Sequence, residues 1–138
     1  IIRGDIPLDA VLKVNPMFNR YPGFIKKLWK KFCAPSYLKK FIPYTDDYNL
    51  ENASLIWSET DIPVIVVGGI RTLESMTGIV NDFKIDAISL CRPLICEPDL
   101  PNKIQNGTFT KSQCTSCNFC TIYCDSSRPL QCYRRVSV

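Results

Sequence analysis

Two short segments of the chain combine the residue types that can bind an anion beside the end of a strand. In Ile62–Arg71 an apolar run leads into Gly68 and Gly69, and in Ile88–Leu94 a second run is followed by Arg92. Glycines carry no Cβ, so a ligand can approach their backbone N–H groups, and arginine can hold a phosphate through two parallel hydrogen bonds. Together the two segments predict a phosphate site at the carboxyl ends of parallel strands.

A third group of chemically active residues is a set of closely spaced cysteines near the end of the chain. Cys114, Cys117, Cys120 and Cys124 repeat the spacing of a bacterial-type iron–sulfur motif, although Asp125 stands where that motif has proline. Short spacings let successive thiolates hold one face of a cluster. The same Cys-x-x-Cys spacing fits a four-thiolate zinc site, and a disulfide framework or a segment without metal also stays open.

The elements expected to position the phosphate site form a strand–helix–strand unit. Ile62–Val67 is a run of mostly β-branched residues without alternation, which is typical of a strand buried on both faces. Thr72 is a suitable N-cap for a helix whose apolar residues recur at helical spacing as far as Phe83. Asp86–Leu90 is expected to be the second strand, which brings Arg92 to its carboxyl end.

The segments around this unit are expected to differ in regularity. Residues 1–43 contain five prolines among aromatic and basic residues, which predicts an irregular insertion with one short helix. The lysines between the apolar residues of 25–32 indicate the solvated face of an amphipathic helix, with a nucleic-acid or membrane surface as the alternative. Further helices are expected at Asp47–Trp57 and, stopped by Gly107, at residues 98–106.

The strand–turn–helix–strand order, followed by Glu97-Pro98-Asp99-Leu100, resembles the C-terminal end of the flavin oxidoreductases of the old yellow enzyme family. The resemblance covers residues 44–132. These enzymes are FMN-dependent (β/α)8 TIM barrels. The resemblance therefore implies an α/β fold in which residues 1–107 are the C-terminal portion of a flavin-binding barrel and residues 108–138 are a cysteine-rich tail.

The same resemblance implies which residues bind the FMN phosphate. In the family, the seventh and eighth barrel strands end in that site, and the second loop usually contains Gly-Arg. The implied first loop is Gly68, Gly69, Ile70 and Arg71, and the implied second loop is Cys91 and Arg92, with cysteine in place of the glycine.

Family members similar to 2,4-dienoyl-CoA reductase carry a [4Fe–4S] cluster on four cysteines just after the barrel. Their third gap is eleven residues, as between Cys120 and Cys132, while their second gap is three residues and that between Cys117 and Cys120 is two. This resemblance implies Cys114, Cys117, Cys120 and Cys132 as ligands, with Cys124 as the alternative fourth ligand.

The resemblance also implies a reaction, hydride transfer from NAD(P)H through FMN to an activated alkene or a similar small-molecule acceptor. The catalytic donors of the family lie in the middle of the barrel, and the chain has no histidine. We therefore expect the catalytic residues upstream of Ile1 and an inactive fragment on its own. The missing N-terminal part of the barrel or an electron-transfer partner protein would complete the enzyme.

Length and composition limit these interpretations. A TIM barrel needs about 250 residues, and this chain has 138 with no initial methionine, so we expect the C-terminal part of a larger protein. Its 46% apolar content, net charge of +4 and lack of a membrane-length apolar run favour a cytoplasmic protein without nucleic-acid or membrane partners. The alternatives are a non-enzymatic zinc- or cluster-binding module and another phosphate-binding barrel, such as a lyase or isomerase.

Overall fold

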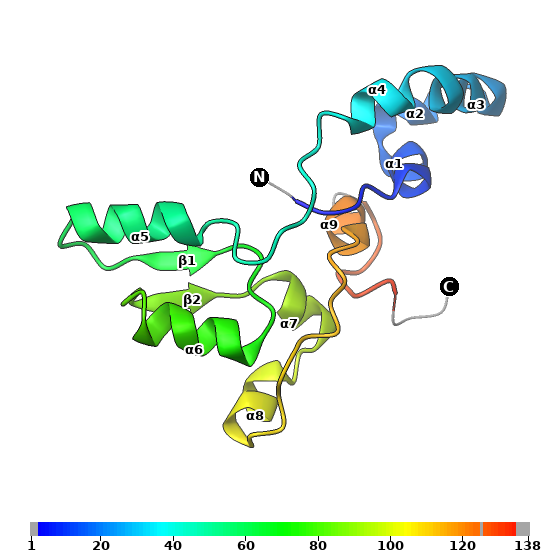
Figure 1. The fold of residues 1–138 in the computed structure, drawn as a ribbon. Coiled ribbons are helices and arrows are strands. Elements are labelled where there is room, and N and C mark those ends of the chain that lie inside the picture. Colours follow the sequence, from blue (N-terminus) through cyan, green and yellow to red (C-terminus); the bar gives the residue numbers. More distant parts are fainter. Residues whose placement is uncertain (1–2, 125, 135–138) are drawn as a thin grey trace. The chain divides into compact units, whose positions relative to one another are not determined.

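The computed structural model describes residues 3–124 and 126–134, which divide into two compact units (Figure 1). The α/β unit is Thr45–Thr115, and the helical unit comprises the described residues of Ile1–Tyr44 and Ser116–Val138. The first residues of the predicted cysteine-rich tail, 108–115, therefore belong to the α/β unit.

The α/β unit contains the expected parallel strand–helix–strand motif. Its elements are α5 (Leu50–Glu59), β1 (Ile65–Val67), α6 (Leu73–Asn81), β2 (Ala87–Ser89), α7 (Arg92–Cys96) and α8 (Leu100–Gln105). The two strands pair in parallel, with Val66 opposite Ile88. Helix α5 packs on β1 and α6 packs on β2 (Figure 1). Both strands are shorter than the sequence predicts, but their order and direction are as expected.

Helix α6 begins where the sequence predicts. The side chain of Thr72 caps it, because its Oγ1 accepts a hydrogen bond from the backbone N–H of Ser75 at 3.1 Å. Met76 and Ile79 then point into the core at helical spacing. The helix ends before Phe83, which is 47% exposed.

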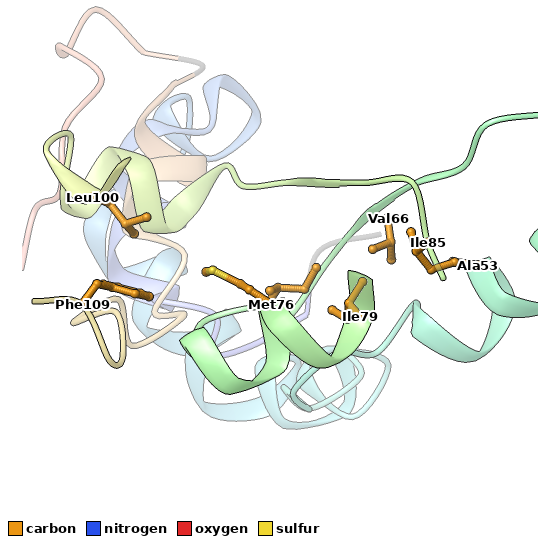
Figure 2. Close-up of a cluster of buried hydrophobic side chains, with 8 residues drawn as sticks. Ala53, Val66, Met76, Ile79, Ile85, Leu100 and Phe109 are labelled. Atoms are coloured by element: carbon orange, nitrogen blue, oxygen red, sulfur yellow. The ribbon is translucent and has the colours of Figure 1, made fainter. Parts of the chain in front are cut away.

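One hydrophobic core holds the α/β unit together, and side chains from most of its elements contribute to it. These side chains come from α5, β1, α6 and α8 and from three connecting segments, and Figure 2 shows most of them. The buried members are Ala53, Val66, Ile70, Met76, Ile79, Ile85, Leu100 and Phe109. This core fixes the strand ends that carry the predicted phosphate turns.

The prediction that β1 is buried on both faces is wrong for this structure. Val66 is buried, but Ile65 is 64% exposed and Val67 is 47% exposed. Successive side chains of a strand point to opposite faces. The core lies on the Val66 face, so the opposite face of the strand is left uncovered by the described residues.

The helical unit corrects the prediction of an irregular insertion with one short helix. Residues 3–44 contain four helices, and a fifth lies in the cysteine-rich segment. These are α1 (Leu8–Val14), α2 (Pro16–Asn19), α3 (Gly23–Phe32), α4 (Ala34–Leu38) and α9 (Phe119–Cys124). Prolines stand at the starts of these helices, Pro7 and Pro22 at the N-caps of α1 and α3 and Pro16 and Pro35 in the first turns of α2 and α4. A proline costs no hydrogen bond there, so it begins a helix instead of breaking one.

Aromatic contacts, with little deep burial, hold α2, α3 and α4 together. Trp29 makes edge-to-face contacts with Phe18 and Tyr37, at ring-centroid distances of 4.9 and 5.8 Å, and Tyr37 contacts Phe41 at 5.1 Å. Helix α1 also packs on α9. The buried apolar residues described in this unit are Ala10, Leu12, Ala34 and Tyr123.

Candidate functional site

The two predicted phosphate turns lie at the same edge of the parallel sheet. Gly68 directly follows β1, and Cys91 comes two residues after β2. The last residues of the strands, Val67 and Ser89, are paired in register. Because the strands are parallel, both turns leave the sheet at its carboxyl edge, where ligands bind in open α/β folds.

The first turn requires glycine at both of its central positions. Gly68 and Gly69 have backbone φ angles of +126° and +84°. A Cβ on Gly68 would lie 2.6 Å from the Tyr48 ring, and one on Gly69 would lie 2.5 Å from the backbone nitrogen of Asp47. The close approach at these glycines is therefore made by the chain itself, through the segment that precedes α5.

Side-chain hydrogen bonds hold that segment over the turn. Asn49 Nδ2 donates to the carbonyl of Val67 at 2.6 Å, and Asp46 Oδ1 accepts from Arg71 Nη2 at 3.0 Å and Nε at 3.3 Å. Arg71 Nη1 also donates to the carbonyl of Cys114 at 3.0 Å. The Arg71 guanidinium is thus shared between Asp46 and Cys114, and it clamps the first turn to the start of the cysteine-rich segment.

The pocket beside Arg71 is acidic. It has a volume of about 340 Å³ and is lined by Asp46, Asp47, Arg71, Thr72, Glu74 and Ser75. Three carboxylates against one guanidinium give this pocket a negative field, which opposes phosphate binding. The Arg71 side chain therefore serves the internal clamp in this structure.

The second turn is more accessible. Cys91 is exposed and Arg92, the first residue of α7, is partly exposed. Cys91 has a φ of −113°, so this position does not need the conformational freedom of glycine, and cysteine is tolerated where the resembling family has Gly. Pro93 follows in the first turn of α7, where its missing N–H is harmless.

The predicted phosphate residues therefore divide into two groups. Gly69 and Ile70 are buried, and Ile70 belongs to the hydrophobic core. Gly68, Cys91 and Arg92 are at least partly exposed at the carboxyl edge. These exposed residues offer backbone N–H groups and one guanidinium, a donor set that fits the phosphate of FMN with Arg92 as its charged contact.

A buried carboxylate fixes the chain that leads to the first cysteine of the tail. Glu97 Oε2 accepts from Gln113 N–H at 2.6 Å and from Ser112 Oγ at 2.8 Å, and Oε1 accepts from Lys103 Nζ at 3.2 Å. Ser112 Oγ accepts in turn from the N–H of Cys114 at 3.2 Å. Burial raises the pKa of Glu97, but the hydrogen bonds from Gln113, Ser112 and Lys103 outweigh it, so the pKa lies below its ordinary value.

The predicted metal ligands fall in both units. Cys114 belongs to the α/β unit, whereas Cys117, Cys120 and Cys132 belong to the helical unit. None of the eight cysteines, all of which lie in the described part of the chain, is in a disulfide. In the part of the chain that the structure describes, no three cysteine, histidine or acidic side chains gather as ligands of one metal ion. The segment carries the donor chemistry of a metal site, and the ligand set stays a prediction.

The alternative fourth ligand and the turn around Cys117 have their own contacts. Cys124, at the end of α9, is exposed and its Sγ donates to the carbonyl of Thr121 at 2.9 Å. Ser116 and Asn118, on either side of Cys117, have positive φ angles of 57° and 60°. Both residues are buried, so the backbone conformation around Cys117 is held by packing within the helical unit.

Sequence reasoning missed three polar residues that position the predicted ones. Asp46 pairs with Arg71, and Glu97 holds Gln113 beside Cys114. Buried Asn118 donates from Nδ2 to the carbonyl of Asp5 at 2.9 Å. The sequence does carry a signal for Glu97, because this acidic residue directly follows the apolar end of α7. Nothing in the local pattern marks Asp46 or Asn118, since their partners are far away in sequence.

Comparison with known proteins shows similarity to parts of two curated reductases. The chain is 29% identical over 108 residues to the cinnamate reductase of Clostridium sporogenes, a match that covers 70% of this chain and 15% of the relative. It is 25% identical over 123 residues to the 4,4'-dithiodibutanoate disulfide reductase of Rhodococcus erythropolis, which covers 88% of this chain and 28% of the relative. The chain thus spans less than a third of either protein. No family model and no solved structure matches it.

Proposed function

We propose that the chain is the C-terminal part of an FMN-dependent oxidoreductase and that it provides the phosphate end of the flavin site. The observation that carries the proposal is the meeting of two turns, at Gly68 and at Cys91–Arg92, on the carboxyl edge of a parallel strand pair. Oxidoreductase character is supported by the two similar proteins, which are both named as reductases. Their low identity supports this broad class and no particular substrate.

We further propose that the α/β unit is the last part of a (β/α)8 TIM barrel. The exposed apolar face formed by Ile65 and Val67 supports this, because closure of the sheet into a barrel would enclose that face. The much greater length of both relatives leaves room for those strands.

In the proposed enzyme, FMN held at these turns would supply the chemistry of hydride transfer between NAD(P)H and a small-molecule acceptor. This chain contributes binding: the Arg92 guanidinium neutralises the phosphate charge, and the backbone at Gly68 donates hydrogen bonds to it. For the acceptor we keep the class that the resemblance implies, an activated alkene or a similar small molecule.

The flavin proposal is tested with two variants, each of which removes one positive charge near one end of β2. In the complete protein, Arg92→Gln removes the proposed phosphate contact, and Lys84→Gln removes an exposed charge from the opposite end of the strand. We expect Arg92→Gln to weaken FMN retention by about 1.5–3 kcal/mol, the usual value of a hydrogen bond to a charged group. Flavin absorbance after dialysis measures this. Equal flavin content in the two variants contradicts the proposed phosphate site.

We extend the proposal to a [4Fe–4S] cluster on Cys114, Cys117, Cys120 and Cys132, with Cys124 as the alternative fourth ligand. The cysteine spacing supports it, and none of the five cysteines is in a disulfide. Iron and acid-labile sulfide are to be counted after anaerobic purification, with about four of each expected per chain. About one zinc and no sulfide would replace the cluster with a structural zinc site.

A further inference from the structure

Positive charge is concentrated in the first third of the chain. Residues 1–44 contain nine lysines and arginines against two aspartates, an excess of seven positive charges, whereas the rest contains eight basic and eleven acidic residues. The helical unit therefore carries a basic character that the modest net charge of the whole chain conceals. Such a field attracts anionic surfaces.

Helix α3, Gly23–Phe32, separates its lysines from its apolar residues. At about 100° per residue, Lys26, Lys27, Lys30 and Lys31 fall on one side of the helix, and Phe24, Ile25, Leu28, Trp29 and Phe32 fall on the other. The helix contains no acidic residue. This pattern is typical of helices that lie in the interface of an anionic membrane.

Only two of the five apolar side chains of α3 line the interior of the helical unit. Ile25 and Trp29 line an apolar cavity of about 440 Å³ shared with residues of α1 and α2. The other three apolar side chains follow one another at four-residue spacing and face solvent. Phe24 is 71% exposed, Leu28 is 58% exposed and Phe32 is 66% exposed. The sequence interpretation, in which the lysines alone face solvent, is therefore incomplete.

The lysines divide in the same way. Lys30 Nζ pairs with Asp9 at 2.7 Å and Lys26 Nζ donates to the carbonyl of Leu12 at 3.3 Å, so these two hold α3 against α1. Lys27 and Lys31 border the exposed apolar row, and Lys31 Nζ lies 5.5 Å from the centre of the Phe32 ring. The outer face of α3 thus combines three large apolar side chains with two cations.

We propose that the outer face of α3 binds the surface of an anionic lipid bilayer. Phe24, Leu28 and Phe32 enter the boundary of the acyl chains, and Lys27 and Lys31 lie at the lipid phosphates. A nucleic acid would pair with the two lysines but would leave the exposed apolar row of α3 in water. Within the described ranges, 3–124 and 126–134, no helix has the length and apolar character to cross a bilayer, so the contact proposed is with the surface. This role is additional to the proposed reductase function and does not depend on it.

The test uses the complete protein and vesicles of phosphatidylcholine with or without 30 mol% phosphatidylglycerol, about a physiological anionic fraction. We expect sedimentation with the anionic vesicles only, and loss of binding at high salt. Lys27→Gln combined with Lys31→Gln should weaken the partition about 25-fold at low salt, because each lysine near such a surface contributes about fivefold.

A matched pair of variants separates the apolar row from general hydrophobicity. Phe24→Ser with Phe32→Ser should abolish binding, whereas Leu55→Ser with Ile56→Ser, which alters similarly exposed residues of α5, should leave it unchanged. A third variant keeps vesicle binding and reports insertion directly. The fluorescence of the tryptophan in Phe24→Trp should be quenched by lipids with brominated acyl chains. The proposal is overturned by equal binding to neutral vesicles, by equal effects of the two serine pairs, or by binding of duplex DNA without binding of vesicles.

Discussion

The α/β unit and the helical unit are stabilised in different ways. The α/β unit has a continuous core in which Ile79, Ile85 and Leu100 are each 1% exposed, and hydrogen bonds to buried Glu97 reinforce it. The helical unit depends on edge-to-face aromatic contacts around Trp29 and on exposed ion pairs such as Lys30–Asp9. Both units leave large apolar side chains exposed, so the difference lies in the continuous buried cluster that forms around the parallel strand pair.

This contrast predicts different responses to mutation in the two units. Substitutions in the α/β unit should remove buried area or leave a buried polar group without its partner, both of which cost several kcal/mol at most. Substitutions of the same kind at exposed residues of the helical unit should change the free energy of unfolding little. The following variants test the contrast in order of expected effect, and all are to be measured by urea denaturation of the complete protein.

The largest effect is expected for Ile79→Ala. This residue is 1% exposed in the core (Figure 2), so its truncation should lower the free energy of unfolding by about 2–5 kcal/mol through lost burial and a residual cavity. Leu28→Ala in α3 is the control, because Leu28 is 58% exposed and should change stability by less than about 0.5 kcal/mol. Similar losses for both variants would show that Leu28 is packed instead of exposed, which contradicts the stated contrast.

The next effect is expected for Glu97→Gln, which removes the negative charge from a side chain only 3% exposed. Losing its charge-assisted hydrogen bonds should cost about 1.5–3 kcal/mol at neutral pH. The folded pKa lies below the ordinary value of 4.5, so the charge stabilises the fold above that pH, and this contribution is lost as the pH falls through the folded pKa.

The difference in unfolding free energy between wild type and Glu97→Gln should therefore be constant near neutrality and shrink below about pH 4.5. Asp99→Asn is a suitable control, since its carboxylate also pairs with Lys103 but is 59% exposed. If the difference in unfolding free energy between wild type and Glu97→Gln stays constant down to pH 3, Glu97 does not make the stability depend on pH.

A smaller effect is expected at the first turn. Gly69→Ala places a Cβ 2.5 Å from a backbone nitrogen at a φ of +84°, which should cost about 1–3 kcal/mol. Gly23→Ala is the matched control in the helical unit, because a Cβ there has no atom within 4 Å and its φ is not positive. The control should be neutral or stabilising by about 0.4–1 kcal/mol. Equal tolerance of alanine at both sites would contradict the geometry of the turn.

The smallest effects are expected for exposed carboxylates. Asp46→Asn and Asp9→Asn each weaken one ion pair, with Arg71 and Lys30 respectively, and the two aspartate side chains are 63% and 77% exposed. Each should cost at most about 1 kcal/mol. A clearly larger loss for Asp46→Asn would mean that the Arg71 clamp contributes more to the α/β unit than a surface pair does.

The sequence predicted the α/β unit well because its signals are local. The apolar spacing of α6, its Thr72 cap and the two strand runs all act within a few residues, and the structure confirms them. The face of β1 that remains open was not predictable, because a β-branched run looks the same whether one face or both are covered. The helices before residue 45 were missed because prolines that begin helices were interpreted as breaks.

The predicted site shows the same limit. Sequence spacing identified Gly68, Gly69 and Arg92 as turn residues, and the parallel pairing brings the two turns to one edge. The direction of the Arg71 side chain depends on Asp46 and Cys114, which lie 25 and 43 residues away. No local pattern could indicate that this guanidinium is used internally.

The sequence by itself determined the strand–helix–strand order, the turns that require glycine and the thiol chemistry of the cysteine-rich segment, because these depend on backbone freedom and on residue type. Only the tertiary structure decided which apolar residues are covered. Ile79 and Phe24 have similar hydrophobicity, yet one is 1% exposed and the other 71%. Burial is a property of what packs against a residue, and the packing partners of these two residues come from different parts of the fold.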